Sequence, residues 1–110
     1  MSITKKFFPD KGICRVEFIL PELSINHAKT VSVVGDFNGW NPDINIMKKD
    51  RDKHFKCSIE FPIGKVYEFR YLIDRYRWEN EWEADAYSPT PYEGEFNMIL
   101  SCELPVKKDE

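Results

Sequence analysis

Apolar residues alternate with polar ones in several short stretches, and this alternation limits the fold more than any other feature. The clearest stretch is residues 55–61, in which every second residue is apolar and lysine, serine and glutamate lie between. A period of two is typical of a β-strand that buries one face. Turn-forming residues separate the stretches, and none shows helical periodicity. We therefore expect an all-β fold, an antiparallel sandwich of about seven strands.

The pattern also divides the chain into an expected domain and two flanking segments. The expected strands are residues 13–20, 30–35, 44–47, 55–61 and 66–74, a return strand that starts at Trp78, and 96–104. Residues 1–12 are expected to be a polar or irregular N-terminal extension, because a proline and a glycine interrupt them. The domain proper spans residues 13–104, and residues 105–110 form a charged tail. Residues 79–94 are acidic and rich in turn formers, so we expect a long irregular crossing there.

The length and charge of the chain exclude several classes of protein. Its 110 residues are enough for one domain. The formal net charge is −3, whereas nucleic-acid binding rests on a basic patch. No apolar run is long enough to span a bilayer, and a proline and an aspartate directly after Phe8 interrupt any signal-peptide core. We therefore expect a cytoplasmic chain whose partners are neither nucleic acid nor membrane.

The cysteines and histidines do not indicate a metal site. Cys14, Cys57 and Cys102 are widely spaced and form no CxxC pair, so we expect buried thiols. One disulfide is left open, although a cytoplasmic location weighs against it. His27 and His54 have no acidic or cysteine neighbours at ligand spacing and are expected on the surface. We expect neither a metal nor another cofactor.

Carboxylates are numerous in the expected loops, but their arrangement does not predict catalysis. None belongs to a nucleophile motif or a metal-ligand spacing. A glycosidase needs two carboxylates that face each other across a sugar in a cleft, and a sandwich of this size leaves little room for one. Turn capping and solubility account for these residues better, so we expect no enzymatic activity.

Aromatic residues concentrate in the expected loops and at strand ends. They are Trp40, Trp78, Trp82, Tyr76, Tyr87 and Tyr92. Each tryptophan is flanked by charged, amide or glycine residues, so burying all three would carry polar groups into the core. We therefore expect at least one exposed indole.

The loop at residues 36–42 is the best candidate to hold such an indole. It follows a β-branched strand, and five of its seven residues are turn formers, which makes it rigid. Such a loop can pack Phe37 towards the core and hold Trp40 outwards. An exposed indole suits a sugar, because its apolar face packs against the C–H groups of a pyranose ring. Arg70 and Asn97 can then provide hydrogen-bonding groups for the hydroxyl rim.

A series of short motifs follows one order along the chain. They are Val33–Pro42, Gly64 with Tyr67, Phe69–Asp74, Trp78–Asn80, Ala84–Asp85, and Gly94–Glu95 with Asn97. This series resembles carbohydrate-binding module family 48. That family includes the glycogen-binding domain of the AMP-activated protein kinase beta subunit and the N-terminal domains of isoamylases and glycogen branching enzymes. The resemblance covers about residues 13–104.

The resemblance implies a fold, a ligand and a set of site residues. The fold is an immunoglobulin-like early-set β-sandwich, and the ligand is an α-1,4-linked glucan (glycogen, starch or a maltooligosaccharide). Trp40 and Trp78 match the two tryptophans of the kinase-type site, and Arg70 stands where the family often has lysine. Asn97 matches the asparagine at the start of the last strand. Asn38, in the same motif as Trp40, is assigned to the carbohydrate-binding site as well.

Two features differ from the kinase-type members. The turn Arg75-Tyr76-Arg77 is longer than the family's usual turn before the second tryptophan. Glu93 and Glu95 replace the apolar and hydroxyl residues of the loop that embraces the sugar. These differences leave a second hypothesis open, a protein-interaction or regulatory module with a degenerate sugar site. Its partner would be a glycogen-metabolising enzyme or a kinase.

Overall fold

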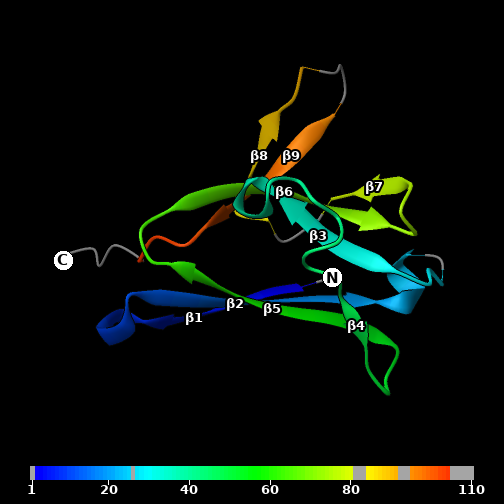
Figure 1. The fold of residues 1–110 in the computed structure, drawn as a ribbon, viewed down its shortest axis with the longest axis horizontal. Coiled ribbons are helices and arrows are strands. Elements are labelled where there is room, and N and C mark those ends of the chain that lie inside the picture. Colours follow the sequence, from blue (N-terminus) through cyan, green and yellow to red (C-terminus); the bar gives the residue numbers. More distant parts are fainter. Residues whose placement is uncertain (1, 26, 81–83, 92–94, 105–110) are drawn as a thin grey trace, which may run out of the picture.

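The computed structural model describes residues 2–25, 27–80, 84–91 and 95–104, which form two antiparallel β-sheets stacked as a sandwich (Figure 1). These residues contain no α-helix, and three short 3-10 turns span Pro9–Lys11, Glu22–Ile25 and Asp36–Asn38. The all-β antiparallel sandwich predicted from the sequence is confirmed. No helix in the described part of the chain is long and apolar enough to cross a membrane.

The first sheet has four strands in the order β1-β2-β5-β4. They are β1 (Ser2–Phe8), β2 (Ile13–Pro21), β5 (His54–Pro62) and the two-residue β4 (Lys48–Lys49). The prediction of an irregular segment at residues 1–12 is wrong, because β1 pairs with β2 along its whole length. Lys5 breaks the alternation, because it lies opposite the buried Val16 and pairs with Asp85, which directly precedes β8.

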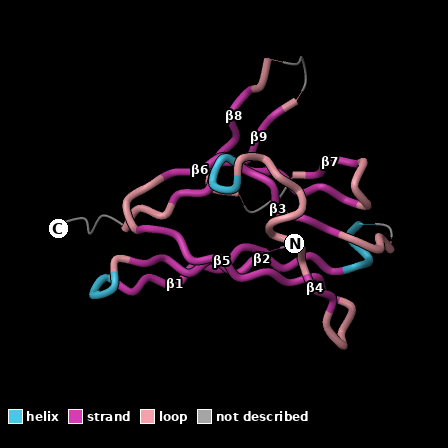
Figure 2. Tube along the Cα trace, in the orientation of Figure 1, coloured by secondary structure: helices cyan, strands magenta, loops and turns pink. Residues whose placement is uncertain are grey.

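The second sheet is organised around β6. Its strands are β3 (Val31–Gly35), β6 (Val66–Ile73), β7 (Arg77–Glu79), β8 (Ala86–Pro89) and β9 (Phe96–Ser101). One edge of β6 pairs with β3, and the other edge pairs with β9 at its start and with β7 at its end. The β8–β9 hairpin projects away from the body of the sandwich, as the trace in Figure 2 also shows. Three strands therefore pair with β6.

Several expected strand boundaries are corrected by the structure. The described residues form nine strands rather than about seven, because β1 and β8 were not expected. The expected return strand at residues 44–47 is reduced to a bridge between Ile46 and Ser32, and β4 begins only at Lys48. β8 lies within the crossing that was expected to be irregular. Trp82, Tyr92, Glu93, Gly94 and the tail at 105–110 lie outside the described residues.

The core lies between the sheets and is filled by alternate residues of their strands. It includes Cys14, Val16, Phe18 and Leu20 of β2, Phe55 and Phe61 of β5, Phe69, Tyr71 and Ile73 of β6, and Met98 and Leu100 of β9. Phe18 packs edge-to-face on Phe69 and Tyr71, with ring centroids 5.4 and 6.2 Å apart. Successive residues of a strand point to opposite faces. Arg70 and Leu72 therefore lie on the outer face of the second sheet.

Candidate functional site

The loop after β3 is fastened to β6. Gly35 lies so close to β6 that an added Cβ would meet the Glu68 carbonyl oxygen at 2.5 Å and Phe37 Cε1 at 2.6 Å. The Asp36 carboxylate accepts a hydrogen bond from the Glu68 backbone N–H at 3.2 Å. The Phe37 ring packs against Phe61, with centroids 5.0 Å apart. The loop is thus rigid, as its turn-rich sequence predicts.

Asn38 holds the loop together from inside. Its side-chain oxygen accepts a hydrogen bond from the Gly35 N–H at 3.1 Å. Its amide nitrogen donates to the Val33 carbonyl at 3.0 Å and to Asn45 Oδ1 at 2.8 Å. These three hydrogen bonds occupy the polar atoms of the amide within the loop, so the structure gives Asn38 an anchoring role. Its assignment as a carbohydrate-binding residue stays a prediction.

Trp40 is presented in a strained backbone conformation. Its φ is 59°, and the preceding Gly39 has a φ of 66°. A bulky residue in this left-handed region is a genuine outlier, and such strain is typical of functional sites. The Trp40 N–H donates to the Gly35 carbonyl at 2.8 Å, which fixes the residue at the loop's end. The side chain is 38% exposed. Phe37 inside and Trp40 outside is the arrangement expected from the sequence.

The β6–β7 hairpin brings the second tryptophan to the same face. Asp74 and Arg75 have φ of 50° and 66°, and the Tyr76 N–H donates to the Ile73 carbonyl at 3.2 Å, as in a type I′ turn. Trp78 lies directly opposite Leu72, so it shares the outer face of the sheet. It is 43% exposed. The unusual turn at Arg75-Tyr76-Arg77 therefore still delivers Trp78 to the outer face.

The Asp74 carboxylate secures this hairpin to the neighbouring loop. It accepts hydrogen bonds from the backbone N–H groups of Lys29 at 2.7 Å and Thr30 at 3.0 Å. The Asp74 N–H in turn donates to the Thr30 carbonyl at 2.8 Å. The N–H groups of Thr30 and Lys29 hold the pKa of the Asp74 carboxyl below its usual range. The turn that carries Trp78 is thus pinned to the start of β3.

Trp40, Arg70, Trp78 and Asn97 line one pocket on the outer face of the second sheet. Its volume is about 320 Å³, and Thr90, Pro91 and Glu95 complete the described lining. Four of the five predicted site residues therefore come together, from a loop and three different strands, and Asn38 does not. Sequence reasoning missed Thr90 and Pro91, because they follow a short edge strand without alternation. The proline-flanked run Ser-Pro-Thr-Pro at residues 88–91 is the signal that could have indicated a fixed loop.

Arg70 forms the floor of this pocket. Its guanidinium carbon lies 5.4 Å from the centroid of the Trp78 ring, and the side chain is only 16% exposed. Its Nη1 is 3.7 Å from Glu95 Oε2, an ion pair that is too long for a hydrogen bond. Its buried Nε has no hydrogen-bond partner among the described residues. The guanidinium thus stacks on the indole and keeps unused donor capacity.

The chemistry of the pocket favours a neutral polyhydroxylated ligand. Indole faces pack on apolar C–H surfaces, while an amide, a guanidinium and a hydroxyl can exchange hydrogen bonds with ligand hydroxyls. Glu95 is the single carboxylate among the described lining residues, whereas glycoside hydrolysis uses two that flank the scissile bond. The pocket is therefore suited to binding.

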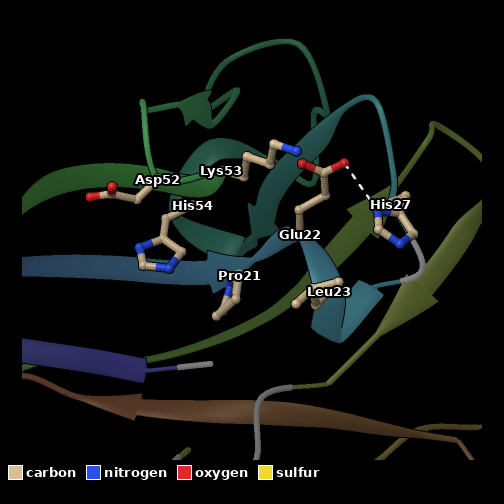
Figure 3. Close-up of a pocket in the computed structure, with 7 residues that line it drawn as sticks. All are labelled: Pro21, Glu22, Leu23, His27, Asp52, Lys53 and His54. Carbon is tan, nitrogen blue, oxygen red and sulfur yellow. Dashed lines mark hydrogen bonds and ion pairs between the residues drawn. The ribbon is translucent and has the colours of Figure 1, made fainter.

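Two other hollows lie away from the pocket that Trp40 and Trp78 line. One, of about 190 Å³, is lined by Pro21, Glu22, Leu23, His27, Asp52, Lys53 and His54. Figure 3 shows the two histidines at opposite ends, with His27 turned towards Glu22. His27 lies on the surface, as expected from the sequence, and its Nδ1 is 3.3 Å from the Glu22 carboxylate, a contact that the sequence did not indicate. Hydrogen bonds from Lys49 and then His27 hold the pKa of Glu22 below its usual range.

The other hollow is larger but lacks exposed tryptophan. Its volume is about 410 Å³. It is lined by Phe37, Asn38, Ile44, Asn45, Ile59, Glu60, Phe61, Pro62 and Tyr67. Its aromatic rings pack edge-on or tilted against one another, and the amide of Asn38 is already hydrogen-bonded. Among the residues that the structure describes, no group of three or more histidines, cysteines and acidic residues is placed to hold a metal ion.

A β-sandwich whose outer face carries a pocket lined by two exposed tryptophans and a few polar side chains has the form of a carbohydrate-binding module. Over residues 25–106 the chain matches the family described as the glycogen recognition site of AMP-activated protein kinase, and it belongs to that family. The match contains every described residue that lines the pocket, and it starts after β2. No curated protein matches the chain significantly.

Proposed function

We propose that the chain binds α-1,4-linked glucan, of the glycogen or starch kind, through the pocket of Trp40, Arg70, Trp78 and Asn97, without catalysing a reaction. The observation that carries this proposal is the convergence of these four side chains on one outer face. A second support is the strained backbone that presents Trp40. The glycogen-recognition family of the chain agrees with this ligand class.

The two tryptophans and the polar side chains recognise different parts of the glucan. The indole faces of Trp40 and Trp78 stack on the C–H faces of glucose units. Arg70, Asn97 and Thr90 then bind hydroxyl groups. Each aromatic contact contributes about 1 kcal/mol beyond the burial of area. The affinity per site is therefore modest, and a branched polymer gains from many chains at once.

Affinity electrophoresis in glycogen-containing gels tests this proposal directly. The wild-type chain is expected to migrate more slowly in glycogen, whereas Trp40→Ala and Trp78→Ala migrate as in its absence. Tyr76→Ala is the matched control, because Tyr76 is 78% exposed and lies outside the pocket. Calorimetry with maltoheptaose measures the same loss as at least a tenfold weaker affinity. Unretarded migration of the folded wild type would refute glucan binding.

A second candidate function is a protein-interaction module with a degenerate sugar site. It is favoured by the Glu95 carboxylate in the pocket and by the guanidinium that covers one face of Trp78. Its partner would be a glycogen-metabolising enzyme or a kinase. Capture of such a partner by a variant that lacks both tryptophans supports this function, and capture that maltoheptaose blocks contradicts it. The cytoplasmic location expected from the sequence stays a prediction under both functions.

A further inference from the structure

Two of the three cysteines are buried together where the sheets meet. Cys14 belongs to β2 of the first sheet, and Cys102 directly follows β9 of the second sheet. Both side chains are fully buried in the same core cluster, and all three cysteines are free thiols. Cys57, on β5, is only half-buried. The core therefore contains a pair of thiols from opposite sheets.

The backbone draws these two strands together at one turn. The Ile63 N–H donates to the Gly12 carbonyl at 2.9 Å, two residues before Cys14. The next residue, Gly64, donates its N–H to the Cys102 carbonyl at 3.0 Å. Cys102 itself donates to the Lys65 carbonyl at 2.8 Å. Consecutive residues of the β5–β6 connection thus tie the start of β2 to the end of β9.

The two thiols interact across this junction. The backbone hydrogen bonds of the β5–β6 connection hold Cys14 and Cys102, both fully buried in one core cluster, on facing sheets beside the same turn. Burial, and then the neighbouring Cys14, raise the pKa of Cys102 to about 12. The thiolate is the nucleophile in disulfide exchange, so the folded pair is unreactive until the junction opens. A disulfide between them is therefore expected to form during folding, before the two thiols are buried.

We propose that Cys14 and Cys102 form an inter-sheet disulfide by exchange with a small disulfide such as oxidised glutathione. One protein thiolate attacks the small disulfide, forms a mixed disulfide and releases one small thiol. The second protein thiol loses its proton, attacks the mixed disulfide and releases the other small thiol. The small disulfide is reduced by two electrons to two thiols, and the two cysteines are oxidised by the same two electrons.

The bond has a defined structural effect. It closes a loop that runs from β2 to the end of β9, which includes nearly the whole sandwich. Closing a long loop removes conformational freedom from the unfolded chain and so raises the stability of the folded one. Neither cysteine is among the described residues that line the glucan pocket. Oxidation therefore raises stability and leaves glucan binding unchanged.

The test uses the whole chain with Cys57→Ser, which leaves the pair as the only cysteines. The protein is unfolded, reduced, and refolded in a glutathione redox buffer, and the same protein refolded in dithiothreitol is the control. We expect the oxidised chain to lose the mass of two hydrogens and a non-reducing digest to link the peptides of Cys14 and Cys102. Its Tm is expected to exceed that of the reduced chain by at least about 5 °C.

Three results would overturn the proposal. The first is two alkylatable thiols after refolding in the oxidising buffer. The second is a disulfide found only between chains. The third is an intramolecular disulfide whose formation leaves the Tm at or below that of the reduced chain, because the bond would then not fit the folded junction.

Discussion

The guanidinium of Arg70 lies over the indole ring of Trp78, with its central carbon 5.4 Å from the ring centroid. The contact connects the centre of β6 with the short strand β7 on the outer face of the sheet. The guanidinium covers one face of the indole and leaves the other face for the proposed sugar. We therefore expect Arg70 to position Trp78 as well as to donate hydrogen bonds to the ligand.

Replacing Arg70 by lysine separates these two roles. Arg70→Lys keeps the positive charge but loses the planar group that stacks on Trp78. We expect the affinity for maltoheptaose to fall about tenfold, which corresponds to ~1.4 kcal/mol, and the near-ultraviolet circular dichroism of the tryptophans to change. Arg75→Lys is the control, because Arg75 pairs with Asp43 at 2.7 Å outside the pocket. Unchanged affinity and dichroism in Arg70→Lys would contradict the stacking role.

The backbone strain at Trp40 is measurable with a pair of substitutions. Trp40→Ala and Trp40→Gly remove the same indole, so both lose its packing and its sugar contact. Only glycine adopts the left-handed φ of 59° without strain. We expect the glycine variant to be more stable than the alanine variant by ~1 kcal/mol in urea unfolding. Equal stabilities, or a more stable alanine variant, would show that the left-handed conformation is absent.

Gly35 is expected to tolerate no side chain. Gly35→Ala would place a Cβ 2.5 Å from the Glu68 carbonyl oxygen, and backbone cannot yield as a flexible side chain does. We expect the free energy of unfolding to fall by about 2–3 kcal/mol. Gly12→Ala is the comparison, because its Cβ would meet nothing within 4 Å and only its φ of 68° is unfavourable. If Gly35→Ala lowers the free energy of unfolding no more than Gly12→Ala does, Gly35 does not lie as close to the Glu68 carbonyl as the structure shows.

The Asp74 carboxylate gives the fold a dependence on acid pH. Its pKa is lower in the folded chain than the ordinary value of 3.8, because the Thr30 and Lys29 N–H groups bind the charged form. Its contribution to stability is therefore complete above that ordinary value and is lost as the pH falls through the folded pKa. We expect Asp74→Ala to lower the Tm at neutral pH and to make the decline in Tm on acidification shallower.

The control for this pH experiment is Asp10→Ala, which removes an exposed carboxylate from the turn after β1. The Tm of this variant should follow the wild-type curve from about pH 7 to pH 2. Parallel curves for Asp74→Ala and the wild type would mean that the Asp74 hydrogen bonds do not stabilise the folded chain.

Substitution of Asn38 tests whether this residue anchors the loop or contacts the sugar. Asn38→Ala removes three hydrogen bonds inside the loop and is expected to lower stability by about 2 kcal/mol. Below the unfolding temperature, its affinity for maltoheptaose is expected to exceed that of Trp40→Ala. An affinity as low as that of Trp40→Ala, with wild-type stability, would instead place Asn38 in contact with the glucan.

The sequence predicted the elements that follow a simple pattern. β2, β5, β6 and β9 alternate clearly, and the turn-rich loop predicted both the partly buried Phe37, which packs against the core, and the exposed Trp40. β1 was missed because Pro9 and Gly12 were expected to interrupt the segment, whereas they lie in the turn into β2. Lys5 also occupies an inward position, which a distant partner, Asp85, makes acceptable. β8 was missed because it is short and largely exposed, so its apolar and polar residues do not alternate.

The residues of the candidate site could be predicted from the sequence, but the contacts between them could not. Trp40, Arg70, Trp78 and Asn97 were named from motifs, and the structure brings them into one pocket. The stacking of Arg70 on Trp78 depends on the register between β6 and β7, which no local pattern encodes. Asn38 was assigned by its place in a motif, whereas its hydrogen bonds show that the motif also encodes the loop's own architecture.

Alternate residues of strand β6 face the core and the pocket. Phe69 and Tyr71 face inwards, and Arg70 faces the pocket from between them. An insertion or deletion of one residue in this strand would exchange the two faces, placing a cation in the core and aromatic rings in solvent. Residues on the outer face can be substituted one at a time, whereas the length of the strand cannot change without exchanging its two faces. Evolution of this site is therefore expected to proceed by replacement within β6, and changes of length are left to the loops around it.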